Sequence, residues 1–241
     1  MANRANPQSL NRFGYVLNNP IRYNDPSGHK ECESTNCNSG ISASAAIKRE
    51  LEKTYKIKIE GSWNQKESIN LRDALFKLEK YLGGRDKLNN LITAAARNRD
   101  ATTISILKVP TTTYKTGDPA RAAWCNGNTK GNCEANRIVY ADGMFDTSYQ
   151  RSGTSFLKPR KFSPEERIQH SMVHEFIHAF ADVRPNAVSE YASRGLGIEE
   201  DMANTVAVYV VSGGAPWVGH DNETKFSADA VSYFVPVSYP P

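Results

Sequence analysis

The stretch His174-Glu175-Phe176-Ile177-His178 determines how the second half of this chain is interpreted. Residues four apart in an α-helix lie on one face, about one turn from each other, so both imidazoles can bind the same metal ion. The glutamate between them can reach a metal-bound water and act as its base. The pattern therefore predicts a helix that carries a Zn²⁺ site. The alternative is a core helix that happens to contain two histidines.

The residues before this motif have the features of a helix start. Ser163 is a favourable N-cap, Pro164 suits the first helical position, and Glu166 stands three residues after the cap. Pro185 is expected to end the helix. Apolar residues recur between these limits with a period of 3.6 at Ile168, Met172, Val173, Phe176, Ile177 and Phe180.

A third protein ligand would leave one of the four zinc positions open for water, as in catalytic sites. Glu200 is the candidate, because it begins a second helical pattern, residues 200–210, whose small residues Ala203 and Ala207 allow close packing against the first helix. Glu199 is the rival ligand, and the register with the two alanines favours Glu200. The alternative is that both glutamates are first-turn acids, which the helix dipole favours.

These motifs resemble the gluzincin branch of the zincin metallopeptidases, in particular the small zincin domains of bacterial toxins. The resemblance rests on the HEFIH motif, on Tyr191-Ala192 and on the Glu-Asp-x-Ala run from Glu200 to Ala203. It implies an α+β, zincin-like fold in which a small twisted sheet packs on helices and the zinc site lies between two helices. It also implies a zinc endopeptidase, in which the metal lowers the pKa of its water and Glu175 transfers the proton to the leaving amine.

The related enzymes stabilise the tetrahedral oxyanion with a Tyr or His donor. Tyr191 is the first candidate for this role, and its alternative is a packed aromatic residue with a satisfied hydroxyl. His220, which adjoins Asp221, is the second candidate, and its alternative is a solvated pair. Zincins also place an edge strand above the metal helix, where an extended substrate adds as a further strand. Residues 137–144 are expected to be that edge, with an internal strand as the alternative.

Three further polar residues lie in register with the proposed ligands. His170 is one turn before His174, and a role outside the metal's own ligand set is expected for it. Asp182 is four residues after His178 and is expected to accept the outer N–H of a ligand. A similar role is expected for Asn204 on the second helix.

Residues 1–40 differ in character from the rest, because Pro, Asn and Gly dominate between short extended pieces, and a flexible leader is the alternative interpretation. The run from Asn11 to Pro20, followed by Asp25-Pro26-Ser27-Gly28, resembles the border of the RHS-repeat core, the shell that encloses toxins in bacterial polymorphic toxin systems. The resemblance implies that this chain is the tip of a much longer protein and that cleavage after the border frees the toxin. It predicts a shell border over 1–29, a linker over 30–41 and a metallopeptidase toxin domain over 42–241.

The local patterns predict an α+β domain with its elements in a mixed order. Helices are expected from Ser42 or Ser44 to Lys53, from the Asn64 cap to Gly83-Gly84, over 86–97 and over 226–234. Strands are expected over 55–60, 103–109 and 136–145. Gly213-Gly214-Ala215-Pro216 breaks the chain after the second metal helix.

Composition and cysteine spacing narrow the range of functions. A charged fraction of 23% and a net charge of +4, spread along the chain, argue against a dedicated nucleic-acid groove, and no apolar run is long enough for a membrane span. Disulfides that pair Cys125 with Cys133 and Cys32 with Cys37 are consistent with an oxidising compartment, and reduced thiols are the alternative.

Three functions follow, in order of preference. The first is a secreted zinc endopeptidase that acts in the target-cell cytoplasm, with a protein substrate there and, as the RHS resemblance implies, a cognate immunity protein in the producing cell. The second is an RHS-delivered toxin of other chemistry, a nuclease or deaminase, although no Pro-Cys-x-x-Cys deaminase motif is present. The third is a non-catalytic binding module on a zincin scaffold.

Overall fold

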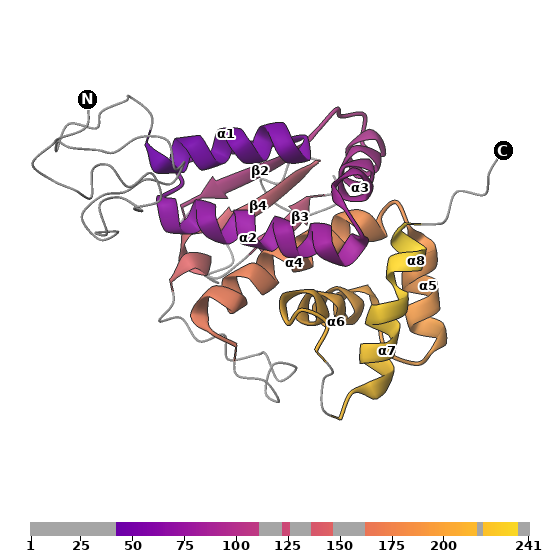
Figure 1. Cartoon of the computed structure of the whole chain (residues 1–241). Coiled ribbons are helices and arrows are strands. Elements are labelled where there is room, and N and C mark those ends of the chain that lie inside the picture. Colours follow the sequence, from indigo (N-terminus) through magenta and orange to yellow (C-terminus); the bar gives the residue numbers. More distant parts are fainter. Residues whose placement is uncertain (1–41, 111–121, 126–135, 147–161, 216–218, 236–241) are drawn as a thin grey trace, which may run out of the picture. The chain divides into compact units, whose positions relative to one another are not determined.

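The computed structural model describes residues 42–110, 122–125, 136–146, 162–215 and 219–235. The chain divides into two units, Met1–Ile41 and Ser42–Pro241, and every described residue belongs to the second. The predictions of a shell border over 1–29 and a linker over 30–41 therefore lie outside the described residues. The elements in chain order are α1 (Ala43–Tyr55), β1 (Ile57–Glu60), α2 (Gln65–Leu82), α3 (Arg85–Arg97), β2 (Ile104–Val109), β3 (Ala122–Cys125), β4 (Arg137–Ala141), the 3₁₀ turn η4 (Asp142–Phe145), α4 (Pro164–Ala181), α5 (Pro185–Ser193), α6 (Glu199–Val211), α7 (Asp221–Asp229) and α8 (Val231–Phe234) (Figure 1).

The four strands form one mixed sheet in the order β1-β2-β4-β3, so the fold class is α+β, as predicted. β1, β2 and β4 run parallel, and Ile106 of β2 lies between Ile59 of β1 and Ile138 of β4. β3 pairs antiparallel with β4, and its Trp124 lies opposite Ile138. The three isoleucines are buried, which gives the middle of the sheet an apolar layer for the helices to cover.

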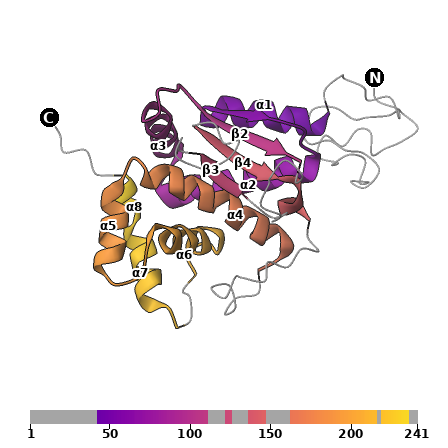
Figure 2. The ribbon, with the colours of Figure 1, turned by 180° about the vertical axis from the view of Figure 1, so that it is seen from behind.

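The helix α4 packs against the strand β3 and against the helices α2 and α6. Figures 1 and 2 show α1, α2 and α3 beside the sheet, whereas α5, α7 and α8 gather around α6. Phe176 and Phe180 of α4 are almost fully buried, and Phe180 packs on Phe234 of α8 with ring centroids 6.3 Å apart. Because α4 contacts so many elements, the motif on it lies within the core and not on a peripheral helix.

The predicted helix starts are confirmed by side-chain caps. Ser163 accepts the amide N–H of Glu166, and the Glu166 carboxylate accepts the amide N–H of Ser163, which completes a capping box. Asn64 and Glu67 form the same arrangement at the start of α2. Gly83 ends α2 in a left-handed conformation, with φ +80°, that favours glycine.

Several predicted boundaries differ from the structure. Tyr55 belongs to α1 and not to a strand, and the strand predicted over 136–145 ends at Ala141 because η4 follows. The helix predicted over 226–234 is two short helices, α7 and α8. Pro185 does not simply end the metal helix, because it stands at the first position of α5, an element that was not predicted.

The prediction that residues 137–144 form the edge strand was wrong. β4 lies between β2 and β3, so it is an internal strand, and β3 is at the end of the strand order. The sequence Ala-Ala-Trp-Cys of β3 contains no β-branched residue, so strand propensity could not reveal it. The edge that lies against α4 is therefore β3.

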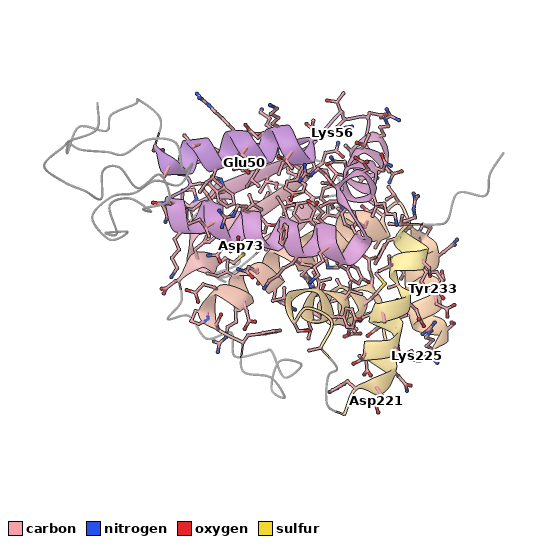
Figure 3. All side chains as sticks on the ribbon, viewed as in Figure 1. Glu50, Lys56, Asp73, Asp221, Lys225 and Tyr233 are labelled. Carbon is pink, nitrogen blue, oxygen red and sulfur yellow. The ribbon has the colours of Figure 1, made fainter. Side chains whose placement is uncertain are left out.

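Side chains crowd the space between the helices and the sheet (Figure 3). Charged residues such as Glu50 of α1 and Lys225 of α7, both labelled there, lie at exposed positions. Among the described residues, no helix combines the length and the apolar character that a membrane span requires.

Replacing Ser163 with Ala removes the cap of α4 and leaves one amide N–H of its first turn without a partner. We expect the free energy of unfolding to fall by about 1 kcal/mol, measured by urea denaturation of metal-free protein. Ser171→Ala is the control, because Ser171 lies within α4 and its hydroxyl only donates back to the Arg167 carbonyl. Equal losses from the two variants would contradict the cap's contribution.

Candidate metal centre

Three potential metal ligands converge where α4 and α6 pack together. The Nε2 atoms of His174 and His178 lie 3.0 Å apart. Glu200, at the start of α6, places one carboxylate oxygen 3.3 Å from His174 Nε2 and the other 3.1 Å from His178 Nε2. These residues could together hold a metal ion. The predicted ligand set is therefore brought together from two helices that are about 20 residues apart in sequence.

The spacing of the three candidate ligand groups suits a zinc ion. Two ligand atoms that each lie about 2.0 Å from a tetrahedral zinc are about 3.3 Å apart; the two imidazole nitrogens are 3.0 Å apart, and the two Glu200 oxygens lie 3.3 Å from His174 Nε2 and 3.1 Å from His178 Nε2, respectively. Two imidazole nitrogens and a carboxylate also match the donor preference of zinc, although other transition metals accept imidazole and carboxylate as well. His174 and His178 are shielded from solvent, whereas the Glu200 side chain is 59% exposed, so the centre is open on the Glu200 side.

The close packing of α6 on α4 explains how Glu200 reaches the histidines. Ala203 and Ala207 of α6 have no exposed surface, as expected for small residues at a helix contact. The His170 ring also faces α6, with its Nε2 3.4 Å from the Asn204 carbonyl oxygen. His170 is outside the group of three ligands, in agreement with the prediction.

Glu199 and Asn204 surround the ligands without joining them. The carboxylate of Glu199 lies 2.7 Å from His178 Nδ1, the nitrogen that faces away from the other ligands. The Asn204 side-chain amide donates to both the backbone carbonyl and the carboxylate of Glu200, so it supports that residue instead of accepting the outer N–H of a ligand as predicted. Such outer contacts orient the ligands. Glu199, considered from the sequence as a rival ligand, is thus a partner of His178.

The acidic neighbours change the protonation of His178. Burial lowers the pKa of His178, but hydrogen bonds with Glu199 and Glu200 outweigh that effect and raise it to about 10. Hydrogen bonds with His174 and His178 hold the pKa of the Glu200 carboxyl well below its ordinary value. Without a metal, the centre at neutral pH therefore contains an ionised Glu200 beside a protonated His178.

Glu175 lies between the metal centre and the sheet. Glu175 is only 6% exposed, and its Oε2 accepts the backbone N–H of Trp124 at 2.5 Å. Its Oε1 lies 4.0 Å from His174 Nε2, so this second oxygen is close to the ligand atoms. Tyr140 is buried on the same side, and burial together with the charge of Glu175 raises the pKa of its phenol. The arrangement supports a carboxylate that can act on a water at the centre.

Asp182 does not accept a ligand N–H, so that prediction was wrong. Its Oδ2 accepts the indole N–H of Trp124 at 2.7 Å and lies 3.5 Å from an Arg99 guanidinium nitrogen. The outer nitrogen of His178 binds Glu199 instead, and Nδ1 of His174 is buried with no hydrogen-bond partner among the described residues. Trp124 was not identified from the sequence, because only tertiary pairing brings β3 next to α4.

Tyr191 and His220 have other partners in the structure. Tyr191 is 1% exposed, its hydroxyl lies 3.1 Å from Thr205 Oγ1, and its ring packs on Phe226 at 4.8 Å. Burial raises the pKa of Tyr191. These contacts favour the packed-aromatic alternative over an oxyanion donor. His220 precedes α7, and its Nδ1 lies 3.1 Å from Glu223.

Cys125, the last residue of β3, is buried and disulfide-bonded. Its predicted partner Cys133 and the predicted pair Cys32 and Cys37 lie outside the described residues. The disulfide is therefore attached at the end of the strand that contacts Glu175.

Comparison of the chain with models of known protein families, with curated proteins and with solved structures found no match. The assignment of a function thus depends on the residues of the centre and on the resemblances found in the sequence.

The two glutamates are expected to differ in their effect on metal binding. Glu200→Ala removes a ligand, so we expect it to abolish stoichiometric zinc binding, whereas Glu199→Ala removes only the partner of His178 Nδ1 and should weaken binding ~10–100-fold. Zinc per chain after dialysis and competition with a chromogenic chelator measure both effects. A greater loss from Glu199→Ala would reverse the two roles.

Zinc binding to metal-free protein at pH 8 should release at least about one proton per chain, that of His178, besides any proton that a metal-bound water loses. The reason is that the pKa of His178 is about 10 without metal, whereas a coordinated imidazole nitrogen must be unprotonated. Glu200 is already ionised and contributes no proton. Apparent zinc affinity should accordingly rise with pH until about pH 10. Calorimetry in two buffers of different ionisation enthalpy gives the proton count, and an identical heat in both buffers would contradict it.

Proposed function

We propose that this chain is a zinc-dependent endopeptidase that acts as the toxic C-terminal tip of a bacterial RHS protein. The observation that carries the proposal is the convergence of His174, His178 and Glu200, with the buried carboxylate of Glu175 beside them. A zincin-like arrangement, in which two helices hold the metal beside a sheet edge, is consistent with this geometry. Two histidines and a glutamate leave a coordination position for water, as a catalytic centre requires and a closed structural site does not.

His174, His178 and Glu200 would hold the zinc ion, which when bound acidifies a water and polarises a carbonyl oxygen. Glu175 would take a proton from the attacking water and deliver it to the leaving amine. One oxygen of Glu175 is held by the Trp124 N–H, so the other stays directed toward the ligand atoms. This division of the two oxygens suits a base that has to keep one orientation.

The position of β3 supports a polypeptide substrate. The carbonyl of Cys125 accepts the Asn136 N–H, so Cys125 faces β4, and Trp124 presents its N–H on the opposite side, toward Glu175. Backbone groups alternate in direction along a strand, so Ala122 presents its amide and carbonyl on the same side as Trp124. An extended peptide can pair with the backbone groups on that side of β3 that Glu175 does not occupy, the amide and carbonyl of Ala122 and the carbonyl of Trp124, and bring one peptide bond to the centre.

The RHS assignment is supported by the border motif alone. Asn11 to Pro20 and Asp25-Pro26-Ser27-Gly28 lie in a segment outside the described residues, so its support is from the sequence. Under this assignment the parent shell delivers the domain to a target cell, where its substrate is a cytoplasmic protein. A neighbouring immunity protein would protect the producing cell.

Glu175→Gln tests the reaction while keeping the shape of the side chain. We expect zinc near one per chain, as in the wild type, but a loss of growth arrest in recipient cells and a cleavage rate lower by about 10²–10⁴-fold. New protein N-termini in intoxicated cells, compared between wild type and variant, identify the cleaved bonds.

Glu165→Gln is the matched control for this experiment. Glu165 is on the same helix, but its side chain is partly exposed and pairs with Lys66 at 3.0 Å, away from the ligands. It should behave as the wild type does. Full growth arrest by Glu175→Gln would refute a zinc peptidase, and degradation of purified nucleic acid by that variant would favour the second function.

A further inference from the structure

Trp124 makes two hydrogen bonds to α4 that are seven residues apart on that helix. Its backbone N–H donates to Glu175 Oε2 at 2.5 Å, and its indole N–H donates to Asp182 Oδ2 at 2.7 Å. Trp124 is 7% exposed, so both bonds are largely shielded from water. Asp182 is the C-cap of α4 and keeps helical backbone angles, and seven residues are about two helical turns, so Glu175 and Asp182 lie on one face, which is the face that β3 contacts.

The two bonds have different consequences. The indole–Asp182 bond fixes the Trp124 side chain, while the backbone bond fixes the orientation of Glu175. Asp182 is itself held by Arg99, whose backbone carbonyl accepts the side-chain amide of Asn136. The backbone N–H of Asn136 in turn donates to the backbone carbonyl of Cys125, the residue after Trp124. The contacts thus form a closed chain from α4 through Arg99 and Asn136 to β3 and back to α4.

We propose that Asp182 and Trp124 are positioning residues for Glu175: the indole–Asp182 bond holds β3 at the distance from α4 at which the Trp124 amide orients the Glu175 carboxylate. The proposal rests on the proposed function of Glu175 as the base. Without the anchor at Asp182, β3 is held to α4 through Trp124 by the backbone bond alone. The Glu175 side chain then gains rotational freedom and spends less time with Oε1 toward the ligands. A loosely placed base reduces the rate of the chemical step more than the affinity for substrate.

The positioning can be measured without any peptidase activity. In protein labelled with ¹⁵N-tryptophan, the amide of Trp124 should exchange slowly with solvent, since it is buried and hydrogen-bonded. We expect Asp182→Ala to raise its exchange rate at least about tenfold. Asp182→Asn keeps an oxygen that can accept the indole N–H, so it should retain most of the protection. The amide of Trp63 in the same spectra is the internal reference.

Activity is measured with a substrate from the cleaved proteins identified above. Trp124→Phe keeps the ring but removes the indole donor, and we expect kcat to fall about tenfold or more with little change in KM and with unchanged zinc content. The matched control is Trp63→Phe. Trp63 is also 7% exposed and also loses an indole hydrogen bond, here to the Glu60 carbonyl, but it has no hydrogen bond to α4 among the described residues.

Because Asp182 and Trp124 act through one bond, Asp182→Ala combined with Trp124→Phe should lose no more activity than either single change. Additive losses, an unchanged Trp124 exchange rate in Asp182→Ala, or an equal kcat loss in Trp63→Phe would overturn the positioning inference. If exchange rises as expected while zinc-loaded wild type cleaves no protein, the proposed function fails and the inferred anchoring of β3 stands. The two failures are therefore distinguishable.

Discussion

The contact between α4 and α6 is the constraint on which the rest of this structure depends. It brings Glu200 within 3.3 Å of the two histidines and Glu199 within 2.7 Å of the outer nitrogen of His178. Ala203 and Ala207 of α6 have no exposed surface, so larger side chains at these positions would overpack the core around α6. The sheet, α2 and α8 in turn enclose α4, so the ligands project from a helix that has little freedom to move.

The negative charges of the carboxylates in the centre are neutralised only in part by positively charged protein groups. Two carboxylates, Glu199 and Glu200, surround His178, and without metal a proton on its imidazole compensates them, as its raised pKa shows. A divalent cation bound at this position would replace that proton. It would also offset the close approach of the two imidazole nitrogens to each other and to the Glu200 carboxylate. The centre therefore has the electrostatic character of a cation site even though each acid has a hydrogen-bond partner. The hydrogen bonds with His174 and His178 likewise hold the pKa of Glu200 below its ordinary value.

The contact between β3 and α4 bears on both tasks that the proposed peptidase must perform, orienting the base and receiving the substrate. The backbone of β3 offers an edge for an extended chain, whereas its Trp124 amide and indole bind α4. Under the proposed function, the same four-residue strand both positions the base and receives the substrate. Its attachment to a disulfide at Cys125 places a covalent constraint at the end of this strand.

The sequence by itself determined the helix α4, its capping box and the candidate metal ligands His174, His178 and Glu200, because these depend on local spacing, on caps and on helical periodicity. It also indicated the α+β class, since helix and strand patterns are local. Only the tertiary structure decided which strand forms the edge, that Glu199 supports His178, that Tyr191 is packed in the core, and that Asp182 binds Trp124. These outcomes depend on contacts between residues up to 58 positions apart, and no local pattern specifies which of several chemically suitable partners the packing brings within reach.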